Sequence, residues 1–198
     1  SHQGQALLDR LYENEDRDVP ETFFDDHSGH AAAAREANMR IADMGVIDTK
    51  VEPPEGLEGR ELELWKYQRY IKDYLRCVAG IDDNVGRVLD WPDEQGLAED
   101  TVVIYTSDQG FFLGDHGWFD KRFMYEPSLR LPLVIRHPGI GTPGQVRQEM
   151  VLNVDIAPTI CDIAGVPVPE VWHGRSLLPI LRGETPKWRE SVYYSYYE

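Results

Sequence analysis

The sequence predicts an α/β fold from a long amphipathic helix and the short apolar strands that follow it. Apolar residues recur at spacings of three and four between Leu64 and Leu89, which is the pattern of one helix face. The next apolar run, residues 101–106 (TVVIYT), is short, β-branched and without alternation, as in a strand buried on both faces. A helix followed by such strands favours an α/β sandwich.

Before the long helix, residues 1–60 form an acidic segment with 14 acidic and 6 basic residues, which we interpret as a variable insertion leading into the core. Residues 30–44 contain four consecutive alanines and are followed by Gly45, so they predict a helix that ends there. His27 and His30 lie three residues apart at the start of this predicted helix. We expect both of them to face solvent rather than to form a ligand pair.

After the long helix, which Pro92 helps to end, the sequence predicts a second strand over residues 133–136. Residues 155–164 predict a helix capped by Asp155 and stopped by a glycine. Residues 191–197 are strand-like. We therefore expect residues 61–185 to form the C-terminal part of a core, and residues 186–198 to begin a strand region that is cut short.

Composition excludes several function classes. The formal charge of −15 argues against binding to nucleic acid or anionic membrane surfaces, because both are bound chiefly through Lys and Arg. The longest apolar runs fall far short of the ~20 residues that a membrane-spanning helix needs. Cys77 and Cys161 lie in helix-like apolar patterns, which predicts buried free thiols and leaves a disulfide open.

Candidate metal ligands follow the first strand. Asp108 and Gln109 come directly after it and precede Gly110, so a turn presents a carboxylate and an amide oxygen at a strand end. Oxygen donors of this kind suit Ca²⁺, which takes 6 to 8 oxygen ligands. The alternative is that the two side chains cap the following turn.

Lys121 and His116 are candidate catalytic residues in the loop that follows. Gly114 and Gly117 permit tight backbone paths there, so Lys121 can reach back toward the strand end and neutralise an anion bound on a metal. His116 is a candidate to donate a proton to a departing oxygen, or else a residue that holds the loop by hydrogen bonds. For Lys121 the alternative is a solvated surface charge.

Residues 106–132 (TSDQGFFLGDHGWFDKRFMYEPSLRLP) resemble the second signature region of the sulfatase family. The shared pattern is T-S-D-x-G, then G-D-H-G, then K, then Y-E-x-S-x-R-x-P. The surrounding order is similar too, with GIDDNVG in the long helix, PLVIRHPG, NVDIAPTICDIAG and GRSLLPIL. The resemblance implies the alkaline-phosphatase-like α/β sandwich of sulfatases, here as its C-terminal portion.

The resemblance also implies a mechanism, in which the hydrate of a formylglycine residue attacks the sulfur of a sulfate monoester and Ca²⁺ holds nucleophile and sulfate together. On this resemblance Asp108 and Gln109 are metal ligands, Lys121 contacts the sulfate, and His116 lies near the site. No Cys or Ser of this sequence begins the C/S-x-P-x-R motif from which formylglycine is made. We therefore expect the nucleophile to belong to an N-terminal portion outside this chain.

The chain is thus expected to be one part of a sulfatase that acts on sulfated sugars. Its motif is most similar to those of enzymes that act on glucosamine 6-sulfate and other glycosaminoglycan sulfates. The chain alone is expected to be inactive. Alternatives are a phosphonate or phosphate monoester hydrolase of the same superfamily, and a non-catalytic fragment or binding module. The resemblance favours a periplasmic or secreted location.

Overall fold

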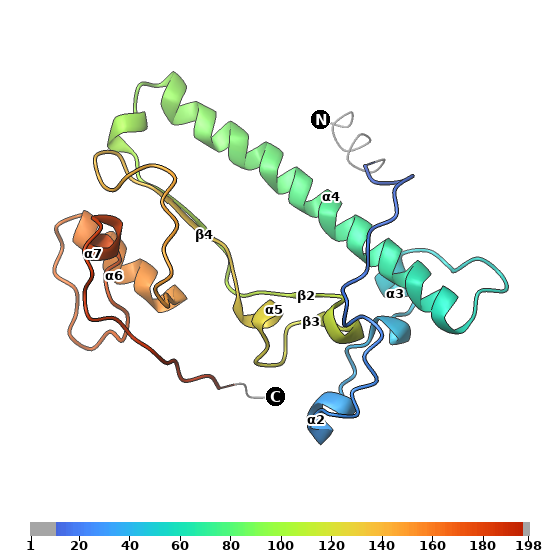
Figure 1. The fold of residues 1–198 in the computed structure, drawn as a ribbon. Coiled ribbons are helices and arrows are strands. Elements are labelled where there is room, and N and C mark those ends of the chain that lie inside the picture. The colour runs from blue at the N-terminus through green and yellow to red at the C-terminus, as the bar shows by residue number, and fades with distance from the viewer. Residues whose placement is uncertain (1–10, 196–198) are drawn as a thin grey trace. The chain divides into compact units, whose positions relative to one another are not determined.

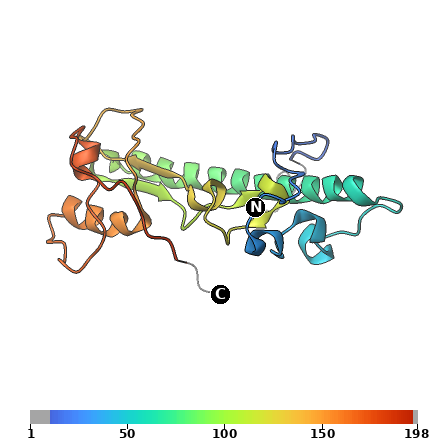
Figure 2. The same cartoon turned by 60° about the horizontal axis from the view of Figure 1, so that its bottom comes forward.

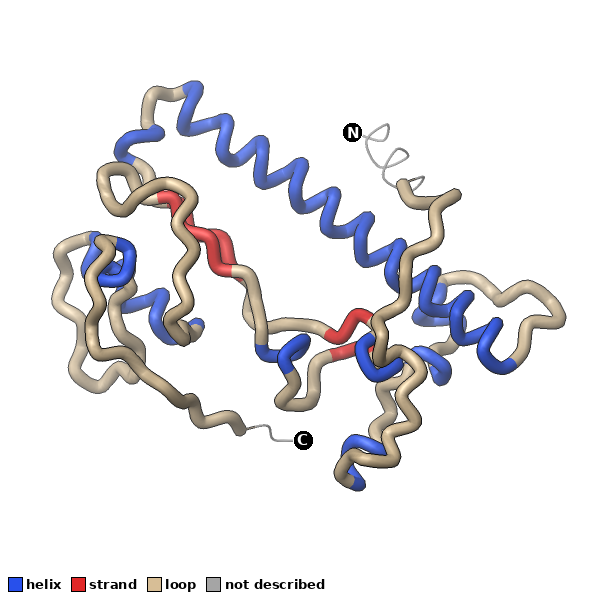
Figure 3. The backbone as a smooth tube through the Cα atoms, viewed as in Figure 1, coloured by secondary structure: helices blue, strands red, loops and turns tan. Residues whose placement is uncertain are grey.

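A computed structural model describes residues 11–195, which form helices joined by long loops and two small sheets (Figures 1 and 3). The helices are α2 Ala32–Arg35, α3 Val46–Thr49, α4 Gly59–Glu94, α5 Glu126–Leu129, α6 Ile156–Ile163 and α7 Leu178–Leu181. The strands are β1 Val103–Thr106, β2 Phe112–Leu113, β3 Phe119–Asp120 and β4 Leu133–Arg136. Short 3-10 turns cover Ile41–Asp43, Ala98–Asp100, Asp115–Gly117 and Asn153–Asp155.

The chain divides into two compact units, and it passes between them three times. The first unit comprises Ser1–Gln95 and Gln109–Leu131, and the second comprises Gly96–Asp108 and Pro132–Glu198. The first unit therefore holds α2 to α5 with the β2–β3 hairpin, and the second holds β1, β4, α6 and α7.

Helix α4 confirms the prediction of a long amphipathic helix (Figures 1 and 2). It spans 36 residues and contains Pro92, after which Gly96 with φ +67 follows the helix end. In its first half, Tyr67 and Ile71 are buried against Phe23, Ile41 and Met44. In its second half several residues of the apolar stripe are exposed, namely Val78, Ile81, Val88 and Trp91.

The β2–β3 hairpin is the part of the first unit that carries the G-D-H-G sequence. Phe112 pairs with Asp120, and Leu113 pairs with Phe119, in antiparallel register. The hydroxyl of Tyr70 on α4 donates a hydrogen bond to the carbonyl of Phe112 (2.8 Å), which ties the hairpin to the helix. Phe112 also belongs to a second buried cluster with Ala34, Met39 and Trp118.

In the second unit, β1 and β4 pair in antiparallel register from Val103 with Arg136 to Thr106 with Leu133. Both strands were predicted. The expectation that the first of them is buried on both faces is wrong for the described residues, because Tyr105 is 40% exposed and the sheet has only two strands.

Asp155 organises the rest of the second unit from a fully buried position beside α6. Its carboxylate accepts hydrogen bonds from the backbone N–H groups of Leu152 and Arg175, both at 2.8 Å. The guanidinium of Arg189 donates to both carboxylate oxygens, one of them at 2.7 Å. The helix predicted over residues 155–164 is confirmed as α6, and Gly165 follows with φ +67. Asp155 does not cap α6 through its side chain, however, because its oxygens serve these other donors.

The helix predicted over residues 30–44 is largely wrong. Only α2 is α-helical there, and Arg40 is extended and forms a bridge with Trp118. Met39 and Ile41, on either side of Arg40, are buried in different clusters. Tertiary packing has therefore overridden the helical propensity of the alanines, as it often does for weak local preferences.

The predicted burial of the cysteines holds only in part, since Cys161 is half-buried and Cys77 is exposed on the second half of α4. Both are free thiols. Residues 191–195 form no strand, and the remainder of the strand predicted over 191–197 lies outside the described residues. Within the described part of the chain, no helix combines the length and apolar character needed to cross a membrane.

Candidate functional site

Asp108 and Gln109, the predicted metal ligands, stand where β1 has ended. Asp108 is exposed, its carboxylate accepts a hydrogen bond from the Ser107 hydroxyl (3.2 Å), and its carbonyl accepts one from the side-chain amide of Asn153 (2.6 Å). Gln109 is half-buried and lies in the other unit. Their sharing of one metal ion therefore remains a prediction from their adjacency in the chain.

Gly110 explains why the turn after these residues is tight. Its N–H donates to the carbonyl of Ser128 (2.9 Å), and a Cβ built on Gly110 would lie 2.1 Å from the carbonyl oxygen of Pro127. No side chain larger than hydrogen fits there. The T-S-D-x-G spacing therefore fixes the backbone immediately after the two oxygen-bearing residues.

The G-D-H-G turn between β2 and β3 presents His116. Gly114 and Gly117 have φ of +105 and +68, and His116 itself lies in the left-handed region with φ +56. A Cβ on Gly117 would meet the carbonyl oxygen of Phe23 at 2.8 Å, and one on Gly114 would meet the ring of Tyr67 at 2.7 Å. The glycines thus allow close packing, while His116 adopts a conformation that non-glycine residues seldom take.

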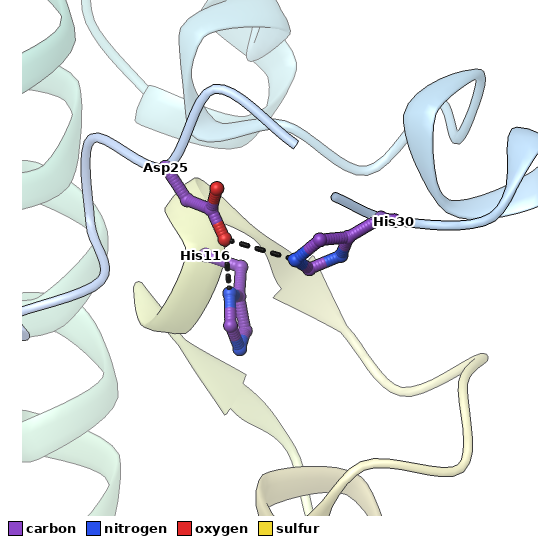
Figure 4. A group of neighbouring side chains, drawn as sticks. All are labelled: Asp25, His30 and His116. Atoms are coloured by element: carbon purple, nitrogen blue, oxygen red, sulfur yellow. Dashed lines mark hydrogen bonds and ion pairs between the residues drawn. The ribbon is translucent and has the colours of Figure 1, made fainter. Parts of the chain in front are cut away.

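His116 contacts a residue 91 positions earlier in the chain, Asp25. Its Nδ1 lies 2.7 Å from Asp25 Oδ2, and its backbone N–H donates to the hydroxyl of Thr22 (3.0 Å). The same carboxylate oxygen lies 3.1 Å from His30 Nε2 (Figure 4). Nδ1 of His30 is 3.0 Å from the Tyr125 hydroxyl. Four side chains from two segments, residues 25–30 and 116–125, therefore form one connected polar cluster.

The cluster is about four-fifths buried and backed by aromatic rings. The side chains of Asp25, His30 and His116 are 22%, 18% and 20% exposed. The ring of the fully buried Trp118 lies 5.4 Å from that of His116. Hydrogen bonds from His116 and from the backbone N–H of His27 lower the pKa of Asp25 to about 2, so its carboxylate is ionised near neutral pH.

The expectation that His27 and His30 face solvent is wrong. His27 is 2% exposed, its ring lies 4.8 Å from that of Trp118, and burial is the main cause that lowers its pKa. The physical reason is local: His27 has φ +58, and residues 11–31 contain no helix, so both imidazoles turn inward. Spacing along a predicted helix was a misleading guide here, whereas the acidic neighbour Asp25 was a usable signal.

Lys121 follows β3 and is exposed, and its backbone carbonyl accepts a hydrogen bond from the Ser128 hydroxyl (2.6 Å). Its neighbour Arg122 lies 3.1 Å from the carboxylate of Asp120. The structure therefore places Lys121 and His116 on the same hairpin region of the first unit. Their roles toward a sulfate group stay predictions.

Known proteins with similar sequences include several sulfatases. The family model described as N-sulphoglucosamine sulphohydrolase, C-terminal, matches residues 114–198. An N-acetylglucosamine-6-O-sulfatase of Bacteroides thetaiotaomicron is 51% identical over 145 residues, which are 72% of this chain and 26% of that protein. A human N-acetylglucosamine-6-sulfatase is 40% identical over 124 residues, which are 61% of this chain and 22% of that protein.

A solved structure matches nearly the whole chain. It is a complex with its substrate D-glucosamine-2-N,6-O-disulfate, and it matches 98% of this chain and 48% of its own with a TM-score of 0.89 and 37% identity. The chain belongs to the sulfatase family. It corresponds to a C-terminal portion, spanning about a quarter of the curated relatives (26% of the first) and about half of the solved one (48%).

The sulfatase assignment confirms the predicted family and fold class. A phosphonate monoester hydrolase from Silicibacter pomeroyi also matches, with a TM-score of 0.63 and 32% identity over 85% of this chain and 30% of that protein. The small sheets and helices described above are thus part of the α/β fold that sulfatases share with alkaline-phosphatase-like enzymes.

Proposed function

We propose that the protein to which this chain belongs hydrolyses sulfate monoesters of amino sugars, such as glucosamine 6-sulfate or related glycosaminoglycan sulfates. The observation that carries the proposal is the 51% identity to an N-acetylglucosamine-6-O-sulfatase over 145 residues. A second support is the match of 98% of this chain to a structure solved with a disulfated glucosamine as substrate.

The nucleophile in this proposal is a formylglycine outside the chain, because these 198 residues contain no C/S-x-P-x-R motif. Ca²⁺ is the proposed metal, held in part by Asp108 and Gln109. Their carboxylate and amide oxygens fit a hard cation, and the exposed Asp108 carboxylate is open to further ligands. When bound, the metal would supply positive charge that polarises the sulfate oxygens.

Lys121 is the proposed contact to the sulfate. Its ammonium carries three donors and lies on an exposed turn, so it can neutralise charge that develops on oxygen as the ester bond breaks. Arg122 is less suited to this role, since its guanidinium already lies 3.1 Å from the Asp120 carboxylate.

His116 is the proposed proton donor to the departing alcohol. Its Nδ1 faces the Asp25 carboxylate, while Nε2 points away from that contact (Figure 4). An ionised carboxylate beside one ring nitrogen fixes the ring orientation and stabilises the protonated imidazolium. In that form Nε2–H is the donor. Asp25 would therefore position His116 without itself touching the substrate.

A phosphonate or phosphate monoester hydrolase is the second candidate, favoured by the 32% identity to the enzyme from Silicibacter pomeroyi. We also propose that the protein is periplasmic or secreted. The support is a Drosophila melanogaster protein called an extracellular sulfatase, which is 44% identical over 108 residues.

The test is to express the parent reading frame and measure release of sulfate from glucosamine 6-sulfate, against a phosphate and a phosphonate monoester. We expect calcium-dependent sulfate release with the sulfate ester preferred. Preference for the phosphonate would support the second candidate, and no turnover by a folded parent would contradict both. The 198-residue chain alone is expected to show none, because charge stabilisation cannot replace a covalent nucleophile.

A further inference from the structure

Three side chains in the first unit bring metal-binding atoms together at a place that the proposed calcium site does not use. The ligand atoms of Asp25, His30 and His116 all lie within 4.8 Å of one another. Asp25 Oδ2 is 2.7 Å from His116 Nδ1 and 3.1 Å from His30 Nε2 (Figure 4). We propose that these three residues bind one transition-metal ion, for which Zn²⁺ is the best fit.

The donor set selects the class of metal. Two imidazole nitrogens and one carboxylate oxygen are ligands that Zn²⁺ and its neighbours in the first row prefer, whereas Ca²⁺ takes oxygen ligands. Bonds of about 2.0–2.1 Å in a tetrahedral site place ligand atoms about 3.3 Å apart. On metal binding, the 2.7 Å contact of Asp25 with His116 would therefore lengthen by about 0.6 Å, and its 3.1 Å contact with His30 by about 0.2 Å.

Neighbouring groups form hydrogen bonds to the proposed ligands, as the residues around a metal site commonly do. Nδ1 of His30 is 3.0 Å from the Tyr125 hydroxyl, which orients Nε2 toward the shared position. The second oxygen of Asp25 accepts the N–H of His27 at 2.8 Å. Such partners fix the ring and carboxylate orientations, and their loss commonly lowers metal affinity 10- to 100-fold.

Access and charge also suit a metal. The three side chains are about one-fifth exposed, so a water can complete the coordination from solvent. Asp25 brings an anionic oxygen ligand to the site, which favours a divalent cation. The buried ring of Trp118 closes the other side of the cluster.

The proposed metal site shares no residue with the proposed calcium site, since Ca²⁺ is assigned to oxygen atoms of Asp108 and Gln109. A transition metal on Nδ1 of His116 would displace the proton of the imidazolium, so the metal-bound form and the proposed proton donor are alternative states of this residue. Metal binding can be measured on the chain without any turnover, so failure of one proposal is distinguishable from failure of the other.

The experiment is titration of the tag-free, chelator-treated chain with Co²⁺, followed by its visible absorption, and then displacement by Zn²⁺. We expect about one equivalent bound, with Zn²⁺ displacing Co²⁺ and excess Ca²⁺ not doing so. Thiolate-to-cobalt charge-transfer bands should be absent, since no cysteine belongs to the site. Zn²⁺ should also raise the melting temperature of the wild-type chain.

Substitutions locate the ion. Asp25→Asn and His30→Gln should each weaken Co²⁺ binding at least ~10-fold, and Tyr125→Phe about 10-fold, because the ligands or their outer partner are lost. His173→Gln is the matched control, since it removes an exposed histidine outside the cluster and should leave affinity unchanged. Circular dichroism checks that each variant is folded.

The proposal is overturned if the wild-type chain shows no saturable Co²⁺ binding or if Ca²⁺ displaces the ion. It is equally overturned if folded Asp25→Asn and His30→Gln bind as the wild type does, or if His173→Gln loses as much affinity as they do. Should either ligand variant fail to fold, Tyr125→Phe and the Zn²⁺-dependent melting shift of the wild type still decide the question.

Discussion

Replacing Asp155 by alanine should destabilise the chain severely. The carboxylate is fully buried, accepts two backbone N–H groups, and pairs with Arg189, whose side chain is 11% exposed. Removing one partner of a buried ion pair costs about 3–5 kcal/mol, because the other charge is left uncompensated. The two orphaned N–H groups would each cost about 1–3 kcal/mol, but these losses overlap with the first. We therefore expect a loss of about 3–5 kcal/mol in the free energy of unfolding, a large share of the 5–15 kcal/mol typical of a domain.

Urea unfolding followed by tryptophan fluorescence measures the loss, and hydrogen exchange at the amides of Leu152 and Arg175 localises it. Asp155→Asn should lose less, about 1.5–3 kcal/mol, because it keeps an acceptor oxygen without the charge. Glu170→Ala is the control, an exposed acidic residue of the same unit for which we expect a change within about 0.5 kcal/mol. A loss under about 1 kcal/mol for Asp155→Ala, or unchanged exchange at both amides, would refute the reasoning.

The same pair predicts an acid-dependent loss of stability. Burial alone would raise the pKa of Asp155, but hydrogen bonds from Arg189 and from two backbone N–H groups outweigh it and bring the pKa below its ordinary value of 3.8. A group with a lowered folded-state pKa stabilises the fold above its unfolded pKa. That stabilisation is lost as the pH falls below about 4 and through the folded-state pKa. Unfolding free energies measured between neutral pH and pH 3 should fall less steeply in Asp155→Asn than in the wild type.

Further substitutions test the site and its turn. In the parent protein, Lys121→Ala should lower kcat ~100-fold or more with little change in KM. Arg122→Ala should lower activity only slightly, and that loss should shrink as salt is added. If steady-state kinetics show Arg122→Ala to be the more damaging substitution, Lys121 is excluded as the sulfate contact. Asp108→Ala should abolish calcium-dependent activity in the parent, and unchanged calcium activation would remove it from the metal site. Gly117→Ala should destabilise the chain by at least about 1–2 kcal/mol in urea unfolding, because φ is +68 and an added Cβ lies 2.8 Å from a backbone carbonyl. Gly86→Ala, where the helix leaves open space, should instead be neutral or stabilising by up to about 1 kcal/mol.

Elements with a strong period could be predicted from the sequence, and elements held by distant contacts could not. The spacing of apolar residues sufficed for α4, and β-branched runs sufficed for β1 and β4. The alanine-rich segment failed because Met39 and Ile41 are buried by residues far along the chain, which no local pattern encodes.

The candidate site divides in the same way. Motif spacing singled out His116 and Lys121, and the tight glycines around His116 were a correct sign of a constrained turn. Asp25 was missed because it lies 91 positions before His116 in the sequence. His30 was noticed and then set aside, since a helix register was assumed that the backbone does not adopt.

Because the two units alternate along the chain, neither is synthesised as one continuous segment. Within this chain, residues 1–95 are synthesised before the hairpin bearing His116 and Trp118, which follows only after Gly96–Asp108. Until then Asp25 and His30 lack one partner, and β1 in turn waits for β4. Neither unit can be completed by an uninterrupted stretch of nascent chain. A fragment ending at Asp108 would therefore retain α4 but lack Trp118, which belongs to the cluster that buries Met39. We expect such a fragment to fold poorly on its own.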